Sequence, residues 1–157
     1  MMKHKKYLIG GAILVVVALI GILFLKYSER TISSAAGYSY SVKHSLKGYD
    51  IWVVSTPRIT KITQSKSSKT NLSYETELNE YKKRVDRIIK LEKQLTKERV
   101  FLSNAQVVQM AELSPADAMQ TFGGIYSSHV AEVCKEIVQL EDECEQIYMT
   151  LGKSISD

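Results

Sequence analysis

The stretch "YETELNEYKKRVDRIIKLEKQL", residues 74–95, decides the fold predicted from this sequence. Its apolar side chains recur at alternating spacings of four and three residues, which is the heptad pattern of a helix with one buried seam. Ser73 precedes the stretch as a capping residue, and acidic residues occupy the expected first turn. The same spacing continues beyond this stretch, so we predict a first long helix over residues 73–113.

A second stretch, "YSSHVAEVCKEIVQLEDECEQIYMTL" at residues 126–151, repeats the 4-3 spacing. Ser114 and Pro115 are suited to the N-cap and the first helical position, so we predict a second helix over residues 114–152. The apolar seams of the two helices are the predicted interaction surface. They comprise Leu78, Tyr81, Val85, Ile88, Leu95 and Leu102 in the first helix, and Val130, Val133, Ile137, Leu140, Cys144 and Ile147 in the second.

Charge blocks predict how the two helices are oriented. Residues 82–99 carry eight basic and three acidic side chains, whereas residues 132–145 carry six acidic and one basic. If the chain folds back at Ser114, facing residues have numbers that sum to about 227, and the two blocks lie opposite each other. We therefore predict an antiparallel helical hairpin with coiled-coil character. Parallel coils in an oligomer are the alternative.

Three charged residues are candidates for selecting the partner of these helices. Glu92 and Arg99 occupy positions of the first seam, where a charge specifies register and partner. Lys135 is the one base of the acidic block, and the antiparallel register places it opposite Glu92. We predict that these three side chains set which helix pairs with which.

Ahead of the helices, the sequence predicts a small β element over residues 38–63. Tyr38, Tyr40 and Val42 alternate with polar residues, which is the period of a half-buried strand. Residues 49–54 form a second run of this kind, so we expect a β hairpin. A hairpin is not stable by itself and needs a covering surface.

At the N-terminus, residues 7–25 form an apolar run without a charge. Nineteen helical residues cover about 28 Å, close to the ~30 Å hydrocarbon core of a bilayer. Lysines precede the run, which favours an N-terminus in the cytoplasm and an exported C-terminal region. We expect a signal-anchor in the inner membrane of the cell, with lipid as a partner; a cleaved signal peptide is the alternative.

Chemistry-bearing patterns are sparse in the rest of the chain. No histidine or cysteine has a second ligand at metal-binding spacing, and no nucleophile has a base partner, so we predict no enzyme, cofactor or metal. Cys134 and Cys144 would lie about 15 Å apart on one helix, beyond the reach of a disulfide. The basic residues lack the interleaved aromatics of a nucleic-acid surface, so no nucleic acid is expected.

Together these patterns predict a mainly α fold class. In chain order we expect a basic leader (1–6), a transmembrane helix (7–25), a linker (26–37), the β hairpin (38–63), a hinge (64–72), the two helices (73–113 and 114–152) and a tail (153–157). This plan resembles that of bacterial division and envelope-assembly proteins, phage inner-membrane spanins and small components of secretion machines.

The resemblance implies a structural role. We expect a single-pass, membrane-anchored assembly component of an envelope complex, which uses its coiled coil to bind itself or partner proteins. One alternative is a lysis protein of the spanin type. The other is a membrane-anchored sensor in which the β element, with Trp52, binds a ligand.

Overall fold

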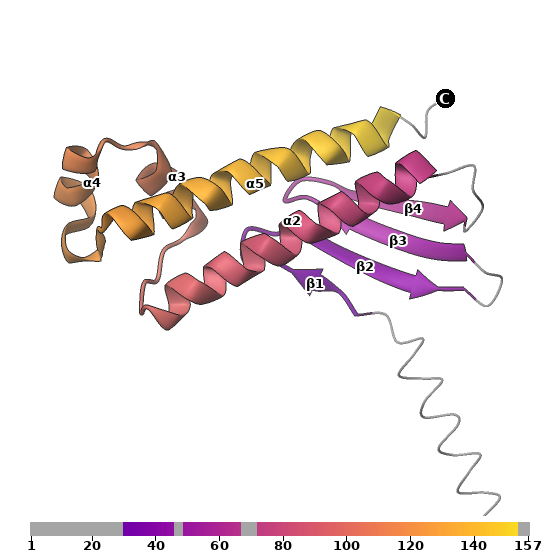
Figure 1. Cartoon of the computed structure of the whole chain (residues 1–157), viewed down its shortest axis with the longest axis horizontal. Coiled ribbons are helices and arrows are strands. Elements are labelled where there is room, and N and C mark those ends of the chain that lie inside the picture. The colour runs from indigo at the N-terminus through magenta and orange to yellow at the C-terminus, as the bar shows by residue number, and fades with distance from the viewer. Residues whose placement is uncertain (1–29, 46–48, 67–71, 154–157) are drawn as a thin grey trace, which may run out of the picture. The chain divides into compact units, whose positions relative to one another are not determined.

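A computed structural model describes residues 30–45, 49–66 and 72–153 of the 157-residue chain (Figure 1). The chain divides into two units at Arg30, and the fold below is that of the second unit, from Thr31 onward. Its strands are β1 (Ile32–Ser33), β2 (Ser39–His44), β3 (Tyr49–Ser55) and β4 (Thr60–Lys66). Its helices are α2 (Leu72–Lys97), α3 (Asn104–Glu112), α4 (Pro115–Phe122), the short 3-10 helix η2 (Gly123–Ile125) and α5 (Ser128–Lys153).

The four strands form one antiparallel sheet in the order β1-β2-β3-β4. Tyr40, Trp52 and Val54 are buried, and the register pairs Tyr40 with Val54. The rings of Tyr40 and Trp52 lie 6.4 Å apart between their centroids. Alternate residues of a strand point to opposite faces, so these side chains form one apolar face that must be covered.

Helices α2 and α5 run side by side across the sheet and supply that cover (Figure 1). Tyr81 of α2 donates its hydroxyl to the Ser55 carbonyl at 2.6 Å, and Tyr40 of β2 donates to Asp86 at 2.6 Å. The buried helix residues are Leu78, Tyr81, Val85, Ile88, Leu91 and Leu95 in α2, and Val130, Val133, Cys134, Ile137, Cys144, Tyr148 and Leu151 in α5. This apolar stripe is broad because each helix contacts more than one neighbour.

The ion pairs between α2 and α5 show that these helices are antiparallel. Arg84 binds Glu143 at 2.7 Å, Arg87 binds Glu136 at 2.7 Å, and Glu98 lies 3.3 Å from His129. Residues with increasing numbers in α2 therefore pair with residues of decreasing number in α5. In the first and third of these pairs the two residue numbers sum to 227, which is the register that the charge blocks predict.

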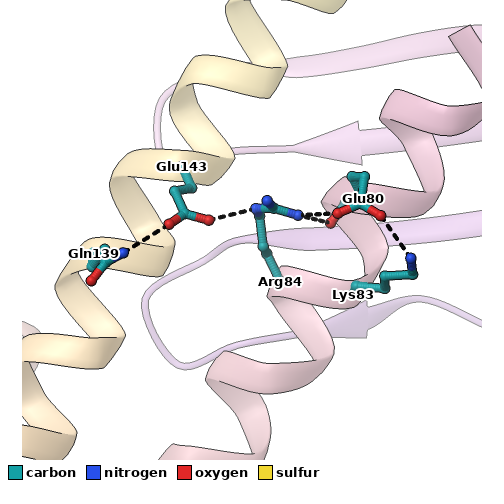
Figure 2. Close-up of polar contacts among 5 residues, drawn as sticks. All are labelled: Glu80, Lys83, Arg84, Gln139 and Glu143. Atoms are coloured by element: carbon teal, nitrogen blue, oxygen red, sulfur yellow. Dashed lines mark hydrogen bonds and ion pairs between the residues drawn. The ribbon is translucent and has the colours of Figure 1, made fainter. Parts of the chain in front are cut away.

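Figure 2 shows that the first of these pairs belongs to a longer polar chain. Arg84 donates from Nε to Glu143 of α5 and from a terminal nitrogen to Glu80 of its own helix, at 2.7 and 2.6 Å. Gln139 donates to the other oxygen of Glu143 at 3.0 Å, and Lys83 pairs with Glu80. The Arg84 side chain thus joins the two long helices in one orientation.

The predicted fold class is wrong in two respects. The β element is larger than a hairpin, and the long helices do not form a coiled coil that stands by itself. The sheet has four strands rather than a hairpin, since β1 lies in the predicted linker and β4 enters the predicted hinge. Both strands are edge strands with few apolar residues, so neither has a clear alternating pattern. The helices pack on this sheet, which makes the unit an α+β domain rather than a mainly α hairpin.

The predicted first helix, residues 73–113, is also wrong in its length. Helix α2 ends at Lys97 because Arg99 adopts a left-handed conformation with φ of 60°. The Val100 N–H then bonds the Leu95 carbonyl, and the Arg99 N–H bonds that of Thr96, which together form a Schellman cap. The chain re-enters a helix at α3, where Ser103 and Gln106 form a capping box.

The second predicted helix starts as expected but does not continue. Ser114 caps α4 and Pro115 is its first residue, which confirms that start signal. Gly123, at φ of 53°, ends α4, and α5 begins only at Ser128. The predicted helix over residues 114–152 is therefore two helices, with η2 between them.

The predicted leader, transmembrane helix and nearly all of the tail lie outside the residues that the structure describes. Among the helices it does describe, none is long and apolar enough to cross a membrane. The expectation of a single-pass membrane protein with a signal-anchor therefore has no support in the described structure.

Replacement of Arg99 by glycine should stabilise the protein. Left-handed backbone costs a non-glycine residue about 1–2 kcal/mol, and part of that gain is offset by the flexibility of glycine in the unfolded chain. We expect Arg99→Gly to raise the free energy of unfolding in urea by about 0.5–1 kcal/mol. Arg99→Ala, which keeps the strain, is the control, and an equal rise in both variants would contradict the Schellman cap.

A double-mutant cycle on Arg84→Ala and Glu143→Gln should give a favourable coupling energy of about 0.5 kcal/mol in urea denaturation. The reason is that the partly covered Arg84 holds the two helices together through this pair. The same cycle on Arg87 and Glu136, which are more exposed, should give a smaller coupling. A larger coupling for the exposed pair would count against the assigned role of Arg84.

Candidate functional site

A cavity of about 160 Å³ opens where the end of α2, the start of α3, α5 and the turn between β1 and β2 meet. Most of its lining is apolar, and two carboxylates converge in it from facing helices. The lining residues are Ala35, Glu92, Leu95, Thr96, Val100, Phe101, Leu102, Asn104, Val107, Ile137 and Glu141. A mostly apolar cavity with a few polar groups is the usual form of a binding site.

The backbone of Ala35 forms one wall of the cavity and is held from both sides. Its N–H donates to the Glu92 carboxylate at 2.9 and 3.1 Å, and its carbonyl accepts from the Asn104 amide at 3.3 Å. Gly37, at φ of 95°, and the Ser34 hydroxyl, which accepts from the Tyr38 N–H, shape this turn. The sheet, α2 and α3 are thereby joined at the cavity.

Glu141 and Glu92 are the two titratable side chains among the described lining residues. Burial, followed by the negative charges of Glu92 and Asp142, raises the pKa of Glu141 to about 7. Burial also raises the pKa of Glu92, although the N–H groups of Ala35 and Ala36 oppose that shift. Two facing carboxylates with raised pKa values form an electronegative site that favours a proton or a cation.

The cavity has buried side chains in its walls and an exposed aromatic side chain at its opening. Leu95 and Ile137 are buried and come from the facing surfaces of α2 and α5. Val107 lines it from α3. Phe101 is 71% exposed and lies in the segment between α2 and α3, where its ring is available to a bound group.

The structure places the predicted seam residues in the core of the domain. Leu102, Leu140 and Ile147 are half-buried, and the other nine are buried. A buried side chain is not available to another chain, so these residues hold the domain together. Leu95, Leu102 and Ile137 also line the cavity.

The three predicted partner-selecting charges have separate environments. Glu92 contacts Ala35, and in the described part of the chain no ion pair joins it to Lys135, which is exposed on α5. Arg99 lies just beyond α2, in its C-terminal cap. The structure therefore brings only Glu92 to the cavity.

Glu141, Ala35 and Asn104 were not among the predicted site residues. Glu141 belongs to the acidic block that predicted the orientation of the helices, and its position depends on which side of α5 meets α2. The capping box at Ser103 and Gln106 was the available signal that a helix begins beside Asn104.

Among the residues that the structure describes, no group of three or more histidine, cysteine, aspartate or glutamate side chains is placed to hold a metal ion. Cys134 and Cys144 are free and buried, and burial raises the pKa of the first to about 11 and of the second to about 12. Thiols with such pKa values are weak nucleophiles at neutral pH.

The sensor alternative assigns Trp52 to a ligand-binding role, and the structure places this side chain in the core of the domain. It is 6% exposed and packs against Tyr40 on the helix-covered face of the sheet. No family model, curated protein or solved structure matches this chain.

The raised pKa of Glu141 predicts a pH-dependent stability. In the unfolded chain this group titrates near 4.5 and in the folded protein near 7, so its contribution is present at low pH and is lost as the pH rises through that window. Glu141→Gln, compared with the wild type, should therefore gain more free energy of unfolding at pH 8 than at pH 5.

Urea denaturation at the two pH values measures this difference. Glu132→Gln, at an exposed position of the same helix, is the control and should change stability equally at both. If Glu141→Gln behaved like this control, Glu141 would not be a carboxylate held with a raised pKa.

Proposed function

We propose that the described domain is a non-catalytic protein-interaction module, an assembly component that binds a side chain of its partner in the Glu92–Glu141 cavity. The observation that carries this proposal is the preformed apolar cavity into which two carboxylates converge. The proposed binding site differs from the predicted one, which was the pair of helix seams, because the seam residues form the core of the domain.

The size of the cavity favours an anchor residue over a whole substrate. A cavity of about 150 Å³ accommodates a group of the size of benzene. The volume here is about 160 Å³, which suits one side chain of a partner. Single side chains that fill a desolvated pocket supply much of the binding energy in protein interfaces.

The surroundings of the cavity support recognition of a protein surface. Phe101 exposes its ring at the rim, where an aromatic side chain adds contact area at little cost in conformational entropy. Leu95 and Ile137 are buried on the two long helices, and packing of this kind holds the walls in place before a partner arrives. A preformed site loses less entropy on binding than one that must be ordered.

Binding is favoured over catalysis by the side chains that are present. Two carboxylates with raised pKa values would also suit acid–base chemistry. The other polar side chains in the described lining are Thr96 and Asn104, and Thr96 donates its hydroxyl to the Glu92 carbonyl. This set offers no nucleophile activated by a base.

Selection of random dodecapeptides on the full chain tests the proposal. We expect enriched peptides whose binding falls at least tenfold in Val107→Phe, since the larger side chain fills the cavity. Met149→Phe is the matched control, at an exposed apolar position of α5 outside the cavity, and should leave peptide binding unchanged.

Thermal unfolding of both variants verifies that they are folded. Enriched peptides that bind Val107→Phe as well as the wild type would contradict the proposal. So would a selection that enriches no peptide.

A further inference from the structure

We propose that the group taken by this cavity is a primary ammonium on an aliphatic arm, the lysine side chain of a partner protein. The inference rests on the proposed function and names the chemistry of the residue that the cavity receives. It is drawn from the charge of the site, the apolar character of its walls and the position of its aromatic rim.

The charge of the cavity calls for a cation. Glu92 and Glu141 line the cavity from facing helices, and the negative charge of Glu92 raises the electrostatic cost of ionising Glu141. Glu92 already accepts the Ala35 N–H, whereas the structure gives the Glu141 carboxylate no hydrogen bond within the described residues. A cation between the two would lower the repulsion and would supply the donors that Glu141 lacks.

The apolar walls of the cavity favour a ligand whose charged group is carried on an aliphatic chain. Leu95 and Ile137 are buried apolar side chains beside the carboxylates, and Val107 lines the cavity from α3. A lysine buries its four methylene groups along apolar surface and keeps its charge at a polar end. A cavity lined by both carboxylates and apolar side chains matches that distribution.

The geometry favours ammonium over guanidinium. An ammonium is a compact charge with three rotatable donors, which can point to carboxylates on different helices. A guanidinium is a planar fork that suits one carboxylate in a bidentate arrangement, and both Glu92 oxygens already accept the Ala35 N–H. At the rim, the exposed Phe101 ring can contact a cation as it enters.

Titration of the full chain with n-butylammonium and with its neutral analogue 1-butanol tests the charge requirement. At pH 8, we expect butylammonium to bind at least tenfold more tightly in calorimetry and to shift the amide NMR signals of Ala35 and Val107. Glu141→Gln should weaken butylammonium about tenfold and change the affinity for 1-butanol less than twofold. Glu132→Gln, the matched control on the same helix, should change neither.

Two negative results of this titration would lead to different conclusions about the cation inference and the proposed function. Equal binding of butylammonium and 1-butanol would overturn the cation inference and leave a cavity that binds apolar groups, as the proposed function allows. If neither ligand bound, both the inference and the proposed function would be overturned.

A second titration, with peptides, distinguishes the lysine side chain of a protein from a free amine as the ligand. The pentapeptide Gly-Gly-Lys-Gly-Gly, blocked at both ends, should bind at least as tightly as butylammonium, and its norleucine analogue should bind at least tenfold more weakly. Binding of butylammonium without binding of the lysine peptide would overturn the assignment to a partner protein and would point to a free amine.

Discussion

The fully buried Tyr81 is the constraint on which the rest of this domain depends. It lies where α2 meets the sheet, and its hydroxyl donates to the Ser55 carbonyl at 2.6 Å. A buried hydroxyl needs such a partner, so this bond fixes how α2 is rotated over the sheet. Glu92 follows eleven residues later, close to three helical turns, and so lies on the same side of α2. The rotation that buries Tyr81 therefore directs Glu92 toward Ala35 in the turn between β1 and β2.

The cavity follows from the way in which α2 ends. The left-handed Arg99 closes the helix with a Schellman cap and turns the chain toward α3, so the segment from Val100 to Leu102 lines the space beside α5. Two carboxylates in such a place reduce stability, because burial disfavours the ionised form of each and the charge of Glu92 further disfavours that of Glu141. A locally unfavourable arrangement that the surrounding fold maintains is characteristic of a functional site.

A heptad spacing has two physical outcomes, and this chain illustrates the choice between them. Residues such as Val85 and Ile137 would suit a narrow seam between two helices, which is why an interaction surface was predicted there. In the structure the buried stripe is wider, since Leu91, Cys134 and Tyr148 join it. The additional width is covered by the sheet and by α3, so the apolar faces are used within the domain. The proposed binding site accordingly lies at a surface that the core leaves open.

The features that could be predicted from the sequence depend on short-range patterns or on the matching of two charged segments. Helical periodicity around Val85 and Ile137, the start at Ser114 and Pro115, and charge blocks that place Arg84 opposite Glu143 are local or pairwise signals. Three features emerge only in the folded domain: β1 and β4 complete a sheet, a left-handed Arg99 caps α2, and Glu92 and Glu141 line one cavity. The reason is physical. Edge strands with few apolar residues are stabilised by their sheet partners, and two carboxylates are brought together by the packing of whole helices, which no short sequence pattern records.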